Sequence, residues 1–310
     1  MTRRKFLSAA IAAPLAISAK PRQPNHFTWY THHRKFAKLP MSRVAYVESG
    51  SGPAALFLHG FPLNGYQWRG ALERLGSLRR CIAPDVMSCG WTETPEAQSI
   101  TPETQAELLS QFLDSLHIAQ VDLVGNDSGG LVSQLFVAKY PGRVRTLLLT
   151  NCDVAENNPP PSFVPLAKAA KDGILYDRFI VSHLQDKSVA RAPQGLGSAF
   201  TYPDKLTDET IEAYLRPFTS SPLRKEQFHR YAIALGQNDL LAVQDRLRTF
   251  TSPVRIVWGD SDQIFTKEWS EKLSATFPNS RGVKHVEGAK LFFPEEMPDL
   301  IDLEARQLWT

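Results

Sequence analysis

The chain has 310 residues, and 43% of them are hydrophobic, which is enough for one large core with an insertion. Its 35 basic and 32 acidic residues give a formal net charge of +3, and three of the basic residues stand together at positions 3–5. Without those three residues the chain is neutral, which argues against nucleic acid or an anionic membrane as a partner.

The first segment, residues 1–19, has the pattern of a signal peptide. Arg3, Arg4 and Lys5 precede a short apolar run that ends in small residues. The arginine pair followed by Phe-Leu resembles a twin-arginine export signal. We therefore expect export to the periplasm, with an uncleaved signal acting as a membrane anchor as the alternative. The mature chain has no apolar run of roughly 18 residues, so no integral membrane segment is expected in it.

Short apolar runs alternate with helical patterns along the rest of the chain. Residues 26–36 and 43–48 are expected to form an antiparallel edge, and the other candidate strands are 54–58, 80–83, 121–124, 144–150, 254–258 and 283–286. The clearest helix is 101–116, which starts with Thr101 as N-cap and Pro102 in the first turn. This alternation predicts an α/β fold: a mostly parallel eight-stranded sheet with helices on both faces.

The pattern changes after Thr150. A turn-rich junction at 157–161 is followed by helical periodicity without a strong strand until Val254. Such a long insertion exceeds an ordinary crossover connection, so it is expected to form a helical cap over the site. The predicted division is a first core part at 26–154, a cap at 155–248 and a second core part at 249–310.

The strongest motif is Gly125-Asn126-Asp127-Ser128-Gly129, which follows an apolar strand and precedes a helical pattern. It fits a strand-to-helix turn of the form Gly-x-nucleophile-x-Gly, with Asp127 at the reactive position. A side chain at 125 or 129 would collide with its neighbours, and the strain of the turn projects the Asp127 carboxylate outward. Ser128 is the rival nucleophile, but that register places Asn126 where the turn needs glycine.

A second turn, His59-Gly60-Phe61-Pro62, follows the strand 54–58. The family resemblance given below implies that the main-chain N–H groups of Phe61 and Ser128 form an oxyanion hole. His59 is expected to anchor this loop rather than to act as a base.

A third turn, Gly259-Asp260-Ser261-Asp262, follows the strand 254–258. The family resemblance given below implies that Asp262 is the catalytic acid, and Asp260 is expected to shape the turn. Asp153, shortly after the strand 144–150, is the alternative acid, and the chain order of nucleophile and acid suits either carboxylate.

From about residue 26 to the C-terminus, these motifs resemble the α/β-hydrolase superfamily, within it the branch of epoxide hydrolases, haloalkane dehalogenases and fluoroacetate dehalogenases. The resemblance is carried by His59-Gly60-Phe61-Pro62 with Trp68, Ala83-Pro84-Asp85 with Gly90, Gly125-Asn126-Asp127-Ser128-Gly129-Gly130, and Trp258-Gly259-Asp260-Ser261-Asp262. It implies that an aspartate attacks an electrophilic carbon to give an ester. A His–Asp pair then activates the water that hydrolyses this ester.

The chain departs from that branch at three places. The segment 288–298 resembles the loop that carries the base, but Leu291 stands where the resemblance implies histidine. Haloalkane dehalogenases usually bind the departing halide with a Trp after the nucleophile and often an Asn after His-Gly, but this chain has Ser128 and Phe61 at those positions. Fluoroacetate dehalogenases usually carry an Arg after the nucleophile, where this chain again has Ser128. Haloalkanes are therefore disfavoured. Epoxide hydrolases use lid tyrosines as acids, and the cap offers Tyr176, Tyr202, Tyr214 and Tyr231.

These residues lead to two function hypotheses. Ester formation needs a carboxylate and a reactive carbon, but ester hydrolysis also needs a base within reach of water. The first hypothesis is a hydrolase with impaired turnover, acting on a small apolar electrophile (an epoxide, an ester or a halide-like compound). His183, His229 or His285 could serve it as a displaced base. The alternative is a catalytically inactive protein that binds or covalently traps its ligand.

No cofactor is implied, since the sequence lacks a dinucleotide fingerprint and has no cluster at metal-ligand spacing. The expected partner is a small-molecule substrate or ligand. Of the three cysteines, Cys81 and Cys152 fall in or beside apolar strands, where a free thiol acts as a small hydrophobe.

Overall fold

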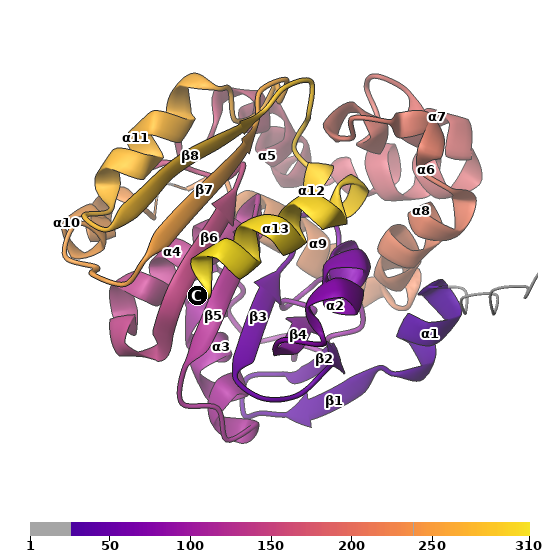
Figure 1. Ribbon diagram of the computed structural model, residues 1–310. Coiled ribbons are helices and arrows are strands. Elements are labelled where there is room, and N and C mark those ends of the chain that lie inside the picture. The colour runs from indigo at the N-terminus through magenta and orange to yellow at the C-terminus, as the bar shows by residue number, and fades with distance from the viewer. Residues whose placement is uncertain (1–25, 238) are drawn as a thin grey trace, which may run out of the picture.

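The computed structural model describes residues 26–237 and 239–310, and the predicted signal segment 1–19 lies outside them. An eight-stranded sheet forms the centre, in the order β1-β2-β4-β3-β5-β6-β7-β8 (Figure 1). The strands are β1 Lys35–Lys38, β2 Arg43–Ser49, β3 Ala54–Leu58, β4 Arg80–Pro84, β5 Val121–Asn126, β6 Val144–Thr150, β7 Val254–Gly259 and β8 Ser280–Val286. β2 is antiparallel to β1 and β4, and all other neighbouring strands are parallel. The predicted fold class is therefore confirmed.

Helices cover both faces of this sheet, with α2 and α13 in front and α3 and α4 behind (Figure 1). The core helices are α2 Arg69–Leu75, α3 Pro102–Ser115, α4 Ser128–Lys139, α10 Gln244–Leu247, α11 Glu268–Thr276, α12 Phe293–Glu296 and α13 Pro298–Leu308. The helix predicted at 101–116 forms as α3, and the Thr101 side chain accepts a hydrogen bond from the Thr104 N–H as its N-cap.

The N-terminal edge differs from the prediction. Residues expected to form a strand from 26 onward instead form helix α1 (His26–His32), and the antiparallel edge consists of β1 paired with β2. The aromatic composition of the segment favours a strand locally. Tertiary packing overrides this preference, because Phe27 and Tyr30, three residues apart on one helix face, both pack edge-on against Tyr66.

Between β6 and β7 the described residues form helices and turns. Besides α10, which contacts α4 of the core, the α-helices there are α5 Val164–Lys171, α6 Ser182–Gln185, α7 Lys187–Arg191, α8 Asp208–Leu215 and α9 Pro222–Ala234. This segment contains the residues predicted as a cap, and α6, α7 and α8 group together at the upper right of Figure 1.

Helix α9 is fastened to the core by buried polar contacts. The Arg224 guanidinium donates to the main-chain carbonyls of Gly90 and Thr92, at 2.6 and 2.8 Å. The Gln227 amide donates to the carbonyl of Thr94 at 2.8 Å. Buried carbonyls left without these donors would be costly, so the contacts hold α9 against the loop at 90–94.

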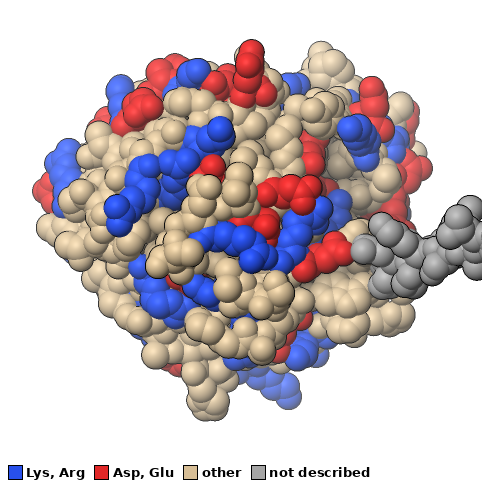
Figure 2. All heavy atoms as spheres, viewed as in Figure 1, with Lys and Arg blue, Asp and Glu red and all other residues tan. Residues whose placement is uncertain are grey.

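Acidic and basic side chains are interspersed on the molecular face shown in Figure 2. Ion pairs among the described residues include Arg74 with Asp299 and Lys267 with Asp260. In the described part of the chain, no helix combines the length and apolar character needed to cross a membrane.

Candidate active site

Asp127 occupies the turn between β5 and α4, with φ at 53°. Residues other than glycine rarely adopt a positive φ, and such strain costs about 1–3 kcal/mol. The flanking glycines make the turn sterically feasible: a Cβ at Gly129 would lie 2.3 Å from the carbonyl oxygen of Leu58, and one at Gly125 would lie 2.5 Å from Ser133 Oγ. The predicted need for small residues at 125 and 129 is confirmed. Ser128 lies inside α4, so Asp127 is the residue that bears the strain.

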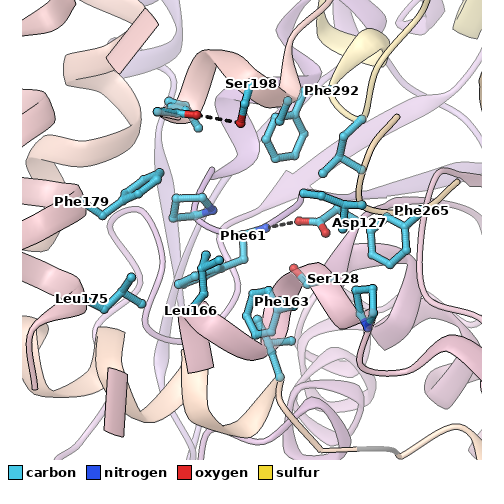
Figure 3. A pocket seen from close by; sticks show the side chains of 18 of the residues that line it. Phe61, Asp127, Ser128, Phe163, Leu166, Leu175, Phe179, Ser198, Phe265 and Phe292 are labelled. Carbon is cyan, nitrogen blue, oxygen red and sulfur yellow. Dashed lines mark hydrogen bonds between the residues drawn. The ribbon is translucent and has the colours of Figure 1, made fainter. Parts of the chain in front are cut away.

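The Asp127 carboxylate points into a cavity and is held by main-chain donors. The Phe61 N–H donates to Asp127 Oδ2 at 2.7 Å (Figure 3). Burial and the nearby Asp153 raise the pKa of Asp127, while the N–H groups of Phe61 and Ser128 lower it. The two predicted oxyanion-hole donors therefore both face the oxygens of this carboxylate.

The cavity has a volume of about 230 Å³ and mostly apolar walls. Phe61, Phe163, Phe179, Phe265 and Phe292 contribute much of its lining (Figure 3). Its volume lies below the range of roughly 300–1,000 Å³ that is usual for drug-sized ligands. The lining therefore suits a small uncharged molecule.

Leu291 lies on this cavity together with Asp127 and is 2% exposed. Its main-chain carbonyl accepts a hydrogen bond from Asn126 Nδ2 at 3.0 Å, which ties the loop after β8 to the residue before Asp127. The structure therefore brings together the two positions on which the sequence argument depended. An alkyl side chain faces the cavity at 291.

Asp262 is buried but is not part of the cavity lining. Its carboxylate accepts hydrogen bonds from the Asn151 amide at 2.9 Å and from the Ile264 N–H at 2.8 Å. Burial raises its pKa to about 6, and its charge contributes to the raised pKa of Asp127. Asp262 is thus near the site, and its carboxylate bonds with an amide and main-chain groups.

The alternative acid, Asp153, lines the cavity itself and is 5% exposed. Asn158 Nδ2 donates to Asp153 Oδ1 at 2.8 Å. Burial is the largest cause that raises the pKa of Asp153, to about 7. Among the described residues, Asp127 and Asp153 are the two ionisable side chains that line the cavity.

Two polar residues that the sequence argument missed hold the turns together. The main-chain carbonyl of Asn151 accepts the Asp127 N–H at 2.8 Å, and its side chain bonds with both the N–H and the carbonyl of Gly259. Gln67 accepts the Gly60 N–H at 3.0 Å and donates to Asn126 at 2.6 Å. The position of Asn151 directly after β6 was the available signal, because sites in parallel sheets lie beyond the carboxyl ends of the strands.

The structure does not bring the three candidate displaced bases to the cavity. His183 Nδ1 donates to the Phe179 carbonyl, and its Nε2 accepts the Leu196 N–H at 3.2 Å. His229 Nε2 accepts the Tyr176 N–H at 3.0 Å.

His285 lies beside the sheet, where its Nδ1 bonds to Asp260 at 2.7 Å. His59 anchors its loop as expected, since its Nδ1 donates to the Gly60 carbonyl and its Nε2 accepts the Val86 N–H. All eight histidines of the chain belong to the described residues, and none of them lines the cavity.

None of the four candidate lid tyrosines lines the cavity either. Tyr214 donates to Glu295 at 2.5 Å, Tyr176 donates to the Phe218 carbonyl at 3.4 Å, and Tyr202 is 44% exposed. The Tyr231 ring packs edge-on against Phe61, and its buried hydroxyl lies near Ser128 and Asp127 without being part of the cavity lining. Contacts within the cap and with Glu295 thus hold the Tyr214 and Tyr176 hydroxyls, and Tyr231 lies behind the cavity lining.

Comparison with known proteins identifies a family and several relatives. A family model described as alpha/beta hydrolase fold matches residues 53–296. Epoxide hydrolase 2 of Siraitia grosvenorii is 38% identical over 148 residues, which cover 47% of this chain and 46% of that protein. Haloalkane dehalogenase 2 of Mycobacterium tuberculosis is 26% identical over 268 residues, which cover 84% of this chain and 88% of that protein.

The fold also matches solved structures. Epoxide hydrolase CorEH without ligand superposes with a TM-score of 0.69 at 20% sequence identity, covering 89% of this chain and 98% of that one. At this identity the likeness shows the fold alone.

Proposed function

The chain belongs to the alpha/beta hydrolase fold family, and on that premise we propose that it is a hydrolase whose Asp127 attacks a small, uncharged electrophile, foremost an epoxide. The observation that carries this proposal is the placement of Asp127. A strained turn directs its carboxylate into an apolar cavity, where the Phe61 N–H lies 2.7 Å from Oδ2. The relatives named epoxide hydrolases support the same reaction class.

The proposed first step is attack of an Asp127 oxygen on an electrophilic carbon, which gives an alkyl ester. In the second step, water adds to the Asp127 carboxyl carbon, and negative charge develops on the remaining carboxyl oxygen. The N–H groups of Phe61 and Ser128 already face this carboxyl group. They would stabilise the charge as an oxyanion hole does.

The second step is expected to be slow. Leu291 faces the cavity where the family resemblance implies a histidine, and a leucine side chain accepts no proton. Loss of a positioned general base costs about 10²- to 10⁴-fold in rate. This favours a second candidate function, covalent trapping of a ligand as a long-lived Asp127 ester.

The cavity lining supports an epoxide over other electrophiles. No Trp, Arg or Lys side chain lines the cavity among the described residues, so none offers an indole or a cation to a departing halide or to a substrate carboxylate. An epoxide keeps its leaving oxygen attached and needs only one proton there. Halide-like compounds and esters remain in the proposed substrate class as poorer alternatives.

Intact-mass measurement tests this proposal directly. Purified protein is incubated with styrene oxide, and the protein mass and the diol are followed together. The isosteric variant Asp127→Asn serves as control. An adduct on the wild-type protein that decays as diol appears supports slow hydrolysis, and an adduct that persists supports trapping. Absence of both adduct and diol, or equal labelling of the variant, would refute the assignment of Asp127 as nucleophile.

We also propose that residues 1–19 direct export of the folded protein. The basic start and the arginine pair support this. Cell fractionation of the wild-type chain and of the variant Arg3→Lys, Arg4→Lys tests it. Equal distribution of both between periplasm and cytoplasm would contradict a twin-arginine route.

A further inference from the structure

We propose that Asp153 carries out the proton transfers at this site: it gives a proton to the opening epoxide oxygen and then accepts one from the water that hydrolyses the Asp127 ester. The inference rests on the proposed function, because it requires that the ester forms. The cavity holds neither an imidazole nor a phenol among its described lining residues, so the usual base and the usual acid are both absent from its walls. Asp153 shares those walls with Asp127.

Polar contacts fix the position of Asp153. Its main-chain carbonyl accepts the Gln134 amide at 2.9 Å, and its Oδ1 accepts the Asn158 amide at 2.8 Å. The Asn158 side-chain oxygen in turn accepts the Asp239 N–H at 3.1 Å. These bonds orient the carboxyl group within the cavity wall, as a group that transfers protons requires.

The charges around Asp153 favour one proton shared between two carboxyl groups. The titratable groups that face it are Asp127, Asp239, Cys152 and Tyr231, and none is a cation. Two buried carboxylates in one cavity cannot both ionise easily, so one of them retains a proton near neutral pH. Burial raises the pKa of Asp153 to about 7, which agrees with this sharing.

Hydrogen bonding decides which carboxyl group is ionised. Asp127 faces the N–H groups of Phe61 and Ser128 and stands at the N-terminus of α4, a helix of 12 residues. Main-chain donors and the helix dipole both stabilise an anion there. The donors to the Asp153 carboxyl group are the Asn158 amide and the main-chain N–H of Asp153 itself, and this residue does not stand at a helix N-terminus. Burial and Asp153 raise the pKa of Asp127 as well. Because the main-chain donors and the helix N-terminus oppose that rise at Asp127, we place the anion on Asp127 and the proton on Asp153.

With the anion on Asp127 and the proton on Asp153, the two carboxyl groups can complete a full reaction cycle. The Asp127 carboxylate attacks a ring carbon, the ring C–O bond breaks, and its oxygen takes the Asp153 proton. The Asp153 carboxylate then removes one proton from water as the hydroxide portion adds to the ester carbon. When the ester C–O bond breaks, the second water proton passes to the leaving alkoxide. The products are the diol, the Asp127 carboxylate and protonated Asp153, which is the starting state. A carboxyl group that alternates between acid and base has a precedent in retaining glycosidases.

Two electrophiles separate the acid role from the base role. Opening of styrene oxide needs a proton on the leaving oxygen, whereas bromide leaves allyl bromide without one. In Asp153→Asn we expect Asp127 ester formation from styrene oxide to slow by about 10²-fold or more, with ester formation from allyl bromide little changed. Release of the ester should slow by a similar factor for both reagents. The exposed cap variant Asp172→Asn is the matched control and should leave all four rates unchanged.

The pH dependence of the wild-type protein gives a test that needs no stable Asp153 variant. Ester release requires the Asp153 carboxylate, so its rate should rise with pH and level off above about 7. The Asp239 carboxylate raises the pKa of Asp153. Asp239→Asn should therefore shift this curve to lower pH without lowering its plateau.

The outcomes distinguish this inference from the proposed function. An Asp127 ester that Asp153→Asn releases at the wild-type rate would overturn the role of Asp153 and leave the nucleophile intact. A wild-type rate of ester release that does not level off with rising pH would also overturn the role of Asp153. Absence of any Asp127 ester from either reagent would overturn the proposed function itself.

Discussion

Replacing Asp153 by asparagine should stabilise the protein at alkaline pH and leave its stability almost unchanged at acid pH. Burial raises the pKa of Asp153 from 3.8 to about 7. The folded state therefore holds the Asp153 proton more tightly than the unfolded state does. The stabilising contribution of this proton is complete below about pH 4 and is lost as the pH rises to about 7. A difference of about three pKa units at ~1.4 kcal/mol each makes the loss about 4 kcal/mol.

An asparagine at 153 avoids this loss because it carries no charge, and its side-chain oxygen can still accept the Asn158 amide. Urea unfolding of both proteins at pH 4 and pH 8 measures the effect. We expect the variant to be more stable by up to about 4 kcal/mol at pH 8 and nearly equal at pH 4. A stability difference that is the same at both pH values would refute the reasoning. A variant less stable at pH 8 would also refute it, since burial would then not penalise the Asp153 charge.

Two further predictions concern the loop at 291 and the Asp127 turn. In the Asp153→Asn background, which lacks the proposed base, Leu291→His should speed release of the Asp127 ester by about 10²- to 10⁴-fold in quenched-flow mass measurements, and Asp262→Asn should cancel that gain. An unchanged release rate would show that position 291 does not face the ester. Gly129→Ala should lower the free energy of unfolding by about 1–3 kcal/mol or prevent folding, because its Cβ would lie 2.3 Å from the Leu58 carbonyl oxygen. Gly142→Ala, with nothing within 4 Å of its Cβ, is the matched control, and equal stability of the two variants would contradict the steric argument.

The sheet and the turn at Asp127 were predictable because their signals are local. An apolar strand, a Gly-x-Asp-x-Gly turn and a helical pattern follow one another within residues 121–140. The tight turn between this strand and this helix projects the side chain at 127 outward, and this conclusion does not depend on more distant segments. The main-chain donors at Phe61 and Ser128 were predicted from the resemblance to α/β-hydrolases.

Other parts of the site depend on contacts between distant segments. Asn151 bonds to Asp262, 111 positions away, and no local pattern marks that pair. The directions of the His183 and His229 rings are set by main-chain groups of neighbouring cap segments. Helix α1 forms where aromatic composition favours a strand, because its aromatic face packs against Tyr66. Such contacts form between segments that are far apart in the sequence, so no local pattern predicts them.

The most direct test of the central claim, that Asp127 forms an ester with the substrate, is a single turnover of styrene oxide in ¹⁸O-labelled water. Because water is proposed to add to the Asp127 carboxyl carbon, the heavy oxygen should enter the peptide that contains Asp127. The first diol released should carry ordinary oxygen. Heavy oxygen in the diol and none in that peptide would contradict the account, since water would then have attacked the epoxide directly.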